Sequence, residues 1–231
     1  MVSLLFITVL IATLIAAEAR SPIRVEASSC SALSWVTGCF VDSSGYDRNV
    51  PPALALSGGA TPVKIQIYLE NIWHLNKDSD IYDLDIYFVE FWNDTRLAHT
   101  FDRHLQYNTR DQIERIWQPD FYFANAIETR TQDIVLPNLF IKIQPDGFIR
   151  LSTRVQIKLP CKKDSCKLKI VTYGFTKDTL DASWVDDDKP IQLNPDLSEG
   201  GISVSSTENK LCSGAYFDKS FNCLTATFNL K

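Results

Sequence analysis

The sequence of 231 residues predicts an all-β domain of antiparallel strands, arranged as a β-sandwich or a barrel. Runs rich in β-branched and aromatic residues recur at short intervals, and several of them alternate between apolar and polar side chains. Turn signals that contain glycine or proline separate these runs. No internal repeat of about 20 to 50 residues and no low-complexity linker divides the chain, so we expect one domain.

The first element expected along the chain is a signal peptide over residues 1–19. Residues 4–17 form an almost unbroken apolar run, which is shorter than the about 20 residues that a membrane helix needs. Ala17-Glu18-Ala19 then supplies a small-x-small cleavage site, although the basic region usual before such a run is missing. We therefore expect residues 20–231 to form a secreted, extracellular domain, and we find no other run long enough to span a bilayer.

A short N-terminal helix is expected between Ser28 and Phe40. A straight helix would hold Cys30 and Cys39 about 13 Å apart, which is beyond the reach of a disulfide. If these two cysteines pair, the segment must bend between them, and Gly38 is a suitable place.

The strands are expected where the pattern has a period of two. Val63, Ile65 and Ile67 alternate with Lys64 and Gln66, which indicates one buried and one solvated face. Turns are expected at residues 57–59 (SGG) and 145–147 (PDG). The predicted strand segments are VKIQIYLENI (63–72), YDLDIYFVEFW (82–92), IKIQPDGFIRLSTRVQIKL (141–159), CKLKIVTYGF (166–175) and CLTATFNL (223–230).

Composition argues against several functional classes. The formal net charge is −5, or −4 once Glu18 leaves with the signal peptide, which is too small to indicate nucleic acid or an anionic membrane as partner. The three histidines, His74, His99 and His104, lack the spacing of a zinc site, so no metal and no cofactor is expected. The chain also lacks Gly-x-Ser-x-Gly and His-Glu-x-x-His motifs. A secreted hydrolase is therefore disfavoured and we expect no enzyme, although carboxylates that converge in space for glycoside chemistry remain compatible with the sequence.

Six cysteines in an exported chain predict three disulfides. Cys161 and Cys166 enclose only four residues, which fits half of a metal site, a redox motif or a clasp on a tight hairpin. Oxidising surroundings argue against the redox motif, and no second ligand pair completes a metal site. A clasp is favoured because opposed Cα atoms in a hairpin lie about 4.5 to 5.5 Å apart, within disulfide range. Separately, Asn93-Asp94-Thr95 is a sequon for N-glycosylation.

Three stretches carry a resemblance to a known family: YDRNVPP (46–52), FWNDTRLAH (91–99) and IWQPDFYFANA (116–126). The Trp-x-Pro-Asp-x-x-x-x-Asn pattern from Trp117 to Asn125 resembles the extracellular ligand-binding domain of Cys-loop receptors, the pentameric neurotransmitter-gated channels. DGFIRLSTRVQIKLPC, TYGFTKDTLDASW and CSGAYFDKSFNC extend the resemblance over nearly all of residues 20–231. The resemblance implies an immunoglobulin-like β-sandwich. Within the family, the chain looks most like glycine-receptor and glutamate-gated chloride subunits.

The resemblance also implies how the cysteines pair. Cys161 and Cys166 occupy the place of the eponymous loop, and Cys212 and Cys223 match a second disulfide of the family. Cys30 and Cys39 are then left to pair by elimination. The family's loop holds thirteen residues with a Phe-Pro-x-Asp element that docks on the membrane domain, whereas four remain here. In this respect the chain resembles a soluble, acetylcholine-binding-protein-like homologue.

Ligand-binding residues are carried over from the family one at a time. Tyr87 matches the aromatic residue of the complementary face, and Tyr173 matches that of the principal face. Tyr216 and Phe221 match the two aromatic residues of the capping loop. Each of the four residues has the alternative of packing in the core, which is least favoured for Tyr216 and Phe221 because they lie in a polar, disulfide-bounded loop. Aromatic ring faces hold cations with about 0.5 to 2 kcal/mol per contact. The resemblance therefore implies a small organic ligand held between neighbouring subunits.

Departures from the family leave the charge of the ligand open. Val89 replaces the arginine that grips the carboxylate of an amino-acid transmitter, Val171 replaces an acidic residue, and Ala124 replaces an aromatic one. Arg150, Ser152 and Arg154 share one strand face and could hold an anionic group, or they could form a solvated face. Asp218 in the capping loop could meet a cation.

The resulting hypothesis is a secreted receptor-like protein that binds a small ligand at the subunit interfaces of a homo- or hetero-pentamer, without its own pore. The alternative is the extracellular domain of an anion-type channel subunit whose membrane part is missing from this chain. A further alternative is a structural partner that assembles into mixed pentamers without binding a ligand.

Overall fold

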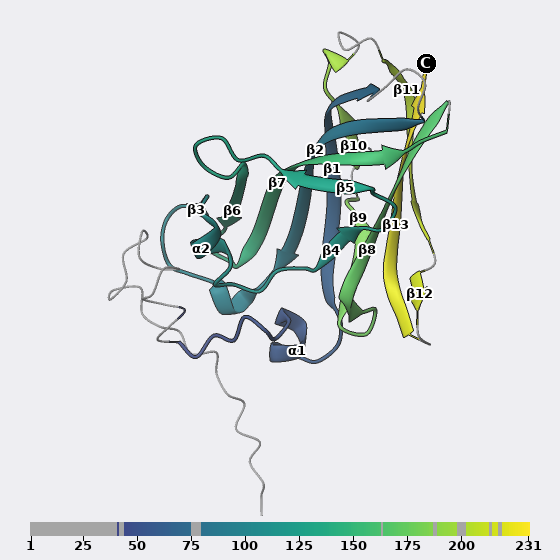
Figure 1. Ribbon diagram of the computed structural model, residues 1–231. Helices are drawn as coiled ribbons and strands as arrows, with labels where there is room; N and C mark the ends of the chain where they lie inside the picture. Colours follow the sequence, from purple (N-terminus) through teal and green to yellow (C-terminus); the bar gives the residue numbers. More distant parts are fainter. Residues whose placement is uncertain are drawn as a thin grey trace, which may run out of the picture.

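The computed structural model in Figure 1 describes residues 41, 44–74, 80–162, 164–186, 189–197, 202–212, 214–216 and 219–231. Three predictions lie outside the described residues: the signal peptide over residues 1–19, the helix between Ser28 and Phe40 with the Cys30–Cys39 pair, and Asp218. The side chains of residues 214–216 and 219 are likewise outside the description.

Two β-sheets pack face to face and confirm the predicted all-β sandwich (Figure 1). The larger sheet has the order β10-β1-β2-β7-β6-β3, with β5 paired to β7 and β9 paired to β1. The smaller sheet has the order β11-β13-β8-β4, with β12 paired to β13. All pairings are antiparallel except those of β9 and β10, which run parallel to β1.

The larger sheet contains β1 (Thr61–His74), β2 (Ile81–Asn93), β3 (Leu105–Tyr107), β5 (Glu128–Thr131), β6 (Leu139–Ile143), β7 (Phe148–Pro160), β9 (Leu180–Trp184) and β10 (Ile191–Leu193). The smaller sheet contains β4 (Phe121–Phe123), β8 (Ser165–Thr176), β11 (Val204–Leu211), β12 (Gly214–Tyr216) and β13 (Lys219–Leu230). The helical segments are short: α1 (Pro52–Leu56), η3 (Thr95–Leu97) and α2 (Arg110–Ile113). Among the described residues, α1 is the helix nearest the N-terminus, and no helix there is long and apolar enough to cross a membrane.

The core lies between the two sheets and follows from the alternation in the strands. On β1, the side chains of Val63, Ile65 and Ile67 are fully buried, as the period of two predicts. Phe88 of β2 reaches across to Phe123 of β4, with ring centroids 5.4 Å apart. Each such buried side chain stabilises the fold by about 1.5 to 3 kcal/mol, so these contacts fix how the sheets sit on each other.

The turn between β6 and β7 depends on a glycine. Gly147 has φ of +88°, a conformation that residues with a Cβ rarely adopt. A Cβ at this position would lie 2.5 Å from the carbonyl oxygen of Asp94. The predicted turn at residues 145–147 is thus confirmed, and it packs against the end of β2.

Several of the residues that carried the family resemblance form a buried polar network rather than a binding site. The carboxylate of Asp94 is fully buried and accepts hydrogen bonds from Arg96 Nε and Nη2, both at 2.8 Å, and from the Tyr46 hydroxyl at 2.9 Å. The Tyr46 hydroxyl in turn accepts a hydrogen bond from the Trp117 backbone N–H at 3.0 Å. Burial raises the pKa of Tyr46 far above its usual value, so the phenol stays neutral. The network ties three distant segments together.

Two of the expected disulfides fall within the described residues. Cys161 and Cys166 close the β7–β8 hairpin, with a Cα–Cα distance of 4.5 Å. Cys212 and Cys223 are joined with a Cα–Cα distance of 4.9 Å. The Cys161–Cys166 hairpin lies beside the end of β13, because the Leu230 N–H donates to the Asp164 carbonyl at 2.8 Å. The clasp interpretation of residues 161–166 is therefore confirmed.

The sequon residue Asn93 is exposed at the end of β2, next to the buried Trp92. Exposure makes the side chain accessible for modification, and its glycosylation stays a prediction.

Candidate functional site

The outward face of the larger sheet brings Tyr87 together with two of the predicted strand-face residues, Ser152 and Arg154. The antiparallel register of β2 and β7 places Tyr87 opposite Arg154 and Val89 opposite Ser152. Because residues at alternate positions of a strand point to the same face, these four side chains share one surface. Residues 150, 152 and 154 therefore do lie on a common face, as the alternation predicts.

An open groove of about 550 Å³ follows this face. Tyr87, Phe140, Ser152 and Arg154 line its floor, and the segment 134–139 forms one wall. The side chains of Ile134 and Val135 in that segment are 86% and 91% exposed, so the wall is apolar and open to solvent. Gln106, Asn108, Pro137, Asn138 and Leu139 complete the lining.

The charge of Arg154 is compensated inside the groove. Its Nη2 lies 2.5 Å and its Nε 3.0 Å from the carboxylate of Asp85, which is buried. The hydrogen bond to Asp85 raises the pKa of Arg154 above its already high value. The guanidinium carbon also lies 5.6 Å from the centroid of the Tyr87 ring. Arg154 thus holds Tyr87 and Asp85 in place and has little charge left to offer an anion.

Two further features of this face were not predicted from the sequence. Tyr68 of β1 packs edge-on against Tyr87, with ring centroids 5.9 Å apart. Phe140 of β6 also lines the groove, between the residues of β7 and Gln106 of β3. Arg150 does not line this groove but a neighbouring hollow, so the structure separates it from Ser152 and Arg154.

The aromatic residue expected on the principal side lies on the smaller sheet. The Tyr173 side chain of β8 is 79% exposed, which rules out the alternative that it packs in the core. Its ring meets that of Tyr122 of β4 edge-on, with centroids 5.8 Å apart and an interplanar angle of 85°. Two exposed tyrosine rings at this angle form a corner that can receive a ligand.

Asp120 fixes the backbone beneath Tyr173. Its Oδ2 accepts hydrogen bonds from the backbone N–H of Gly174 at 2.5 Å and of Phe175 at 3.1 Å. Its carbonyl oxygen accepts the N–H of Tyr173 at 3.1 Å. A Cβ at position 174 would lie 3.2 Å from Oδ2, so glycine leaves room for this contact. The aspartate of the Trp-x-Pro-Asp pattern therefore positions Tyr173 through its backbone.

Tyr122 was missed at the sequence level, although the sequence contains its signal. In the stretch FYFAN, Phe121 and Phe123 point inward to Phe88, with ring centroids 6.0 Å and 5.4 Å away. The residue between them must point outward. Alternation over three residues could have identified Tyr122 as an exposed ring.

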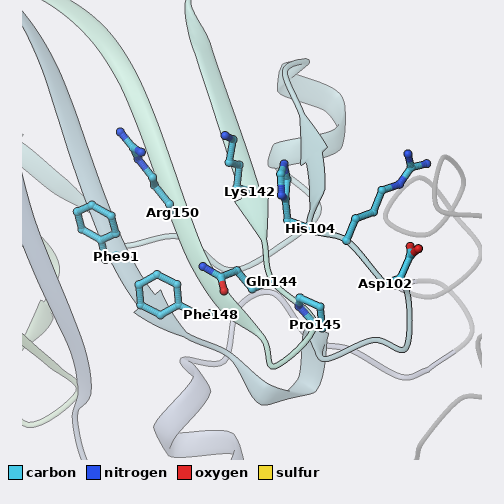
Figure 2. A pocket seen from close by; sticks show the side chains of 9 residues that line it. Phe91, Asp102, His104, Lys142, Gln144, Pro145, Phe148 and Arg150 are labelled. Atoms are coloured by element: carbon cyan, nitrogen blue, oxygen red, sulfur yellow. The ribbon is translucent and has the colours of Figure 1, made fainter.

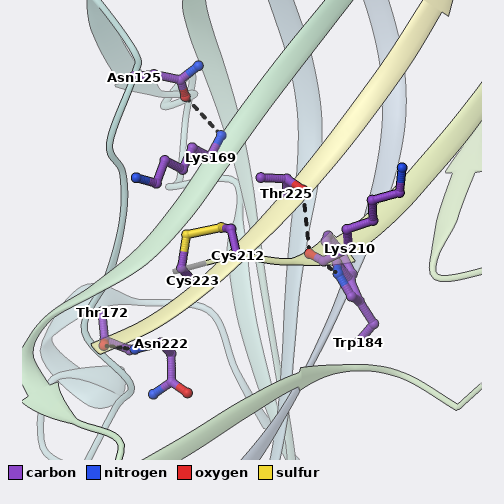
Figure 3. Close-up of a disulfide and its surroundings, with 9 residues drawn as sticks. All are labelled: Asn125, Lys169, Thr172, Trp184, Lys210, Cys212, Asn222, Cys223 and Thr225. Carbon is purple, nitrogen blue, oxygen red and sulfur yellow. Dashed lines mark hydrogen bonds between the residues drawn. A yellow bond between two sulfur atoms is a disulfide. The ribbon is translucent and has the colours of Figure 1, made fainter. Parts of the chain in front are cut away.

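The capping hairpin stands next to this corner. Phe221 of β13 is half-buried and pairs with Gly214 of β12 and Thr176 of β8 in the two ladders. Figure 3 shows the Cys212–Cys223 disulfide at the base of the hairpin, with the backbone N–H of Asn222 donating to Thr172. Tyr216 lies in β12, and its side chain is outside the description.

Asn222 anchors the hairpin to the rest of the sandwich. Its N–H donates to Thr172 Oγ1 at 3.2 Å, and its Nδ2 donates to the Leu180 carbonyl at 2.6 Å. Its Oδ1 accepts the Ala182 N–H at 3.0 Å. The base of the hairpin is thus tied to both sheets.

A buried carboxyl group lies behind the aromatic corner. Glu90 of β2 has the same parity as Phe88 and Trp92 and is 5% exposed, so it faces the core. Burial, together with the negative charge of Asp120, raises the pKa of Glu90 to about 8. This carboxyl group therefore carries a proton at neutral pH.

Tyr87 lies on the larger sheet and Tyr173 on the smaller one, and the rings that they meet, Tyr68 and Tyr122, belong to those same sheets. A single chain therefore presents two separate aromatic surfaces. Each surface is open to solvent.

Comparison with known proteins links this arrangement to one family. The family model described as the neurotransmitter-gated ion-channel ligand binding domain matches residues 41–231. The chain is 28% identical over 188 residues to the gamma-aminobutyric acid receptor subunit theta of Mus musculus, covering 75% of this chain and 29% of the relative. It is 29% identical over 195 residues to the glycine receptor subunit beta-type 4 of Caenorhabditis elegans, covering 78% and 41%. It is 26% identical over 191 residues to the glutamate-gated chloride channel of Drosophila melanogaster, covering 78% and 41%. The chain spans less than half the length of these relatives.

Proposed function

This chain belongs to the neurotransmitter-gated ion-channel ligand-binding domain family, and we propose that it binds a small organic ligand between neighbouring subunits of an extracellular pentamer. The observation that carries the proposal is the presence of two incomplete aromatic surfaces on different sheets. The groove around Tyr87 supplies one side, and the corner of Tyr122 and Tyr173 supplies the other. If one subunit presents its groove to the corner of the next, both surfaces enclose one crevice.

The chemistry of the two surfaces favours a ligand with an apolar body. Ring faces and edges attract apolar groups and cations, at about 0.5 to 2 kcal/mol for each cation contact. Asp85 already neutralises Arg154, and position 89 holds a valine, so the described groove offers no unpaired cation to a carboxylate. We therefore propose that the ligand is neutral or cationic at the end that enters this groove.

The test begins with a screen for a ligand. Gamma-aminobutyric acid, glycine, glutamate and a set of quaternary ammonium and amphiphilic amines are added to the purified protein, and thermal unfolding is followed. A ligand at a hundredfold excess over its dissociation constant stabilises the folded state by about 2.7 kcal/mol, which is readily measured. Native mass measurement of the same sample gives the number of chains in the assembly.

Tyr173→Ala then tests the site. Because the ring is 79% exposed, the substitution should change the free energy of unfolding by less than about 0.5 kcal/mol. It should weaken binding of the ligand found in the screen by about tenfold or more. Leu211→Ala is a matched control, since Leu211 is 68% exposed on β11, outside both aromatic surfaces. Full affinity in both Tyr173→Ala and Tyr87→Ala would contradict the proposed site, whereas no thermal shift with any compound of the screen would favour a structural subunit.

A second candidate function is the extracellular domain of a channel subunit. The names of the relatives favour it, because they are receptors and channels, and the chain spans only part of their length. The full transcript distinguishes the two candidates, because four apolar runs of about 20 residues after Lys231 would indicate a membrane domain. In that case the four-residue loop between Cys161 and Cys166 would lack the element by which the family's loop docks on the membrane, so coupling would need another contact.

A further inference from the structure

A second hollow lies beside the groove on the outward face of the larger sheet (Figure 2). Its volume is about 730 Å³. Figure 2 shows Phe91 on β2, Lys142 on β6 and Arg150 on β7, with the loop that carries Asp102 and His104 at the far side. Arg103, Gln144, Pro145 and Phe148 complete the lining.

The lining of this hollow is strongly basic. Arg103, Lys142 and Arg150 contribute three positive charges and Asp102 one negative charge, so with His104 neutral the net charge is +2. The whole chain, in contrast, carries a formal charge of −5. Among the described residues, none of the three cations has a carboxylate partner. Within the described part of the chain, the local excess of positive charge is thus left uncompensated.

Two of these cations oppose each other directly. The register of β6 and β7 pairs Lys142 with Arg150. Like charges at directly opposed positions of an antiparallel pair destabilise the sheet, so this pairing costs stability unless something negative lies between the two heads. In Figure 2 the side chains of Arg150, Lys142 and His104 point in the same direction from three neighbouring segments.

Aromatic rings hold the cations from one side and offer a flat wall. The guanidinium carbon of Arg150 lies 5.8 Å from the ring centroid of Phe91 and 5.7 Å from that of Phe140. Lys142 Nζ lies 5.6 Å from the Phe140 centroid. The rings of Phe91 and Phe148 stack with an interplanar angle of 23° and centroids 6.1 Å apart. The cations are therefore pre-positioned beside an apolar surface.

We propose that this hollow is a binding site for a small organic oxyanion, meaning a phosphate, sulfate or carboxylate group carried on a flat apolar body. Arg150 and Lys142 hold the oxyanion through charge-assisted hydrogen bonds, and the Gln144 amide donates a further one. The rings of Phe91 and Phe148 take the apolar body. This site goes beyond the proposed function, because Phe140 separates it from the groove that contains Tyr87.

Calorimetric titration of the whole protein tests the site with defined probes. Phenyl phosphate, inorganic phosphate and benzyl alcohol are compared at constant ionic strength and at millimolar concentrations, below those at which phosphate stabilises proteins non-specifically. Phenyl phosphate should bind at least tenfold more tightly than inorganic phosphate, and benzyl alcohol should not bind measurably. Equal affinity for the two phosphates would overturn the apolar part of the site, and no saturable binding of either would overturn the whole proposal.

Variants that remove one positive charge from the hollow test whether phenyl phosphate binds there. Arg150→Gln and Lys142→Gln should each weaken phenyl phosphate binding by about tenfold or more, because each removes a charged hydrogen bond. Lys167→Gln is a matched control, since Lys167 is exposed on β8 of the other sheet, and its affinity should stay within twofold of that of the unmodified protein. Both cationic variants should also unfold at higher urea concentration in low salt without probe, because the repulsion between the paired cations is relieved.

The test of the oxyanion site can be distinguished from the test of the proposed interfacial ligand site. Tyr173→Ala should leave phenyl phosphate binding unchanged, because Tyr173 lies on the smaller sheet. Loss of phenyl phosphate binding in Tyr173→Ala, or full binding in the Arg150→Gln and Lys142→Gln variants, would overturn the assignment of the oxyanion to this hollow.

Discussion

At the scale of single residues, Glu90 places an ionisable group in the hydrophobic core. Its carboxyl group shares the inward face of β2 with Phe88 and Trp92. Burial raises its pKa most, and the negative charge of Asp120 raises it further. Ionising a carboxyl group in this environment is costly because water no longer solvates the charge. The folded protein therefore keeps a proton on Glu90 at pH values where the unfolded chain has lost it.

The raised pKa of Glu90 makes stability depend on pH in a defined direction. The pKa is about 8 in the folded protein against 4.5 for an unperturbed glutamate, so between these values the folded state binds more protons than the unfolded state. Stability is then highest below about pH 4.5, as far as this group is concerned, and is lost as the pH rises toward about 8. Glu90→Gln removes the titration and should raise the free energy of unfolding at pH 8.5 by about 2 to 4 kcal/mol.

Urea denaturation at pH 5, 6.5 and 8.5 checks this expectation. Glu90→Gln should show a flatter profile than the unmodified protein over this range. Glu114→Gln is the control, since Glu114 is exposed and its substitution should leave the profile unchanged. An unmodified protein with equal stability at pH 5 and 8.5, or a Glu90→Gln profile that parallels it, would contradict the assignment.

At the scale of elements, the two disulfides clasp hairpins with different surroundings. Cys161 and Cys166 are both buried in the core at the β7–β8 turn, and the sequence separation between them is 5. Cys212 and Cys223, with a separation of 11, close the hairpin that carries Phe221. The Cys161–Cys166 disulfide therefore stabilises the fold. The Cys212–Cys223 disulfide also positions Phe221, a proposed ligand contact.

Removing each disulfide should separate these effects. Cys161→Ala with Cys166→Ala should lower the free energy of unfolding by about 2 kcal/mol, because the closed loop is short, and should leave ligand affinity unchanged. Cys212→Ala with Cys223→Ala should lower the free energy of unfolding by about 3 kcal/mol and also weaken ligand binding by about fivefold or more. Urea denaturation and calorimetric titration measure the two quantities. A greater loss of affinity from the first pair than from the second would contradict this assignment of roles.

The long strands could be predicted from the sequence because each buries one face along many residues. The segments 63–72, 82–92, 166–175 and 223–230 all lie inside strands of the structure, and residues 141–159 form two strands joined at Gly147. The shorter strands gave no such signal. In β11 (Val204–Leu211), for example, most residues are exposed, so the strand is defined by its pairing with β13 rather than by a hydrophobic pattern.

The site was only partly predictable for a related reason. Family resemblance identified Tyr87 and Tyr173, whereas Phe140 and Lys142 were not identified. Their importance depends on which strand is their neighbour and which face is outward, and both follow from the β6–β7 register. The ion pair of Arg154 with Asp85 was likewise not identified, because the two residues lie 69 positions apart in the sequence and meet across the β2–β7 pairing.

At the scale of the whole molecule, the positions of Tyr87 and Tyr173 make assembly a requirement for the proposed site. The two residues lie on different sheets, so one chain cannot enclose a ligand between them. Assembly with the groove of one subunit against the corner of the next is a head-to-tail contact, and such contacts close into a ring when the rotation per subunit is right. A pentamer is the ring proposed for this family member.

Engineered cysteines test this geometry directly. Tyr87→Cys and Tyr173→Cys subunits, mixed and oxidised under mild conditions, should form disulfide-linked dimers, because each new cysteine meets the other only across a subunit interface. A chain that carries both substitutions should form linked species of up to five chains, visible on a non-reducing gel and by mass measurement. Either variant alone should remain unlinked, because like positions would face different neighbours around the ring. If native mass measurement gives a ring and the doubly substituted chain still forms no links, Tyr87 and Tyr173 do not share a crevice and the interfacial site is wrong.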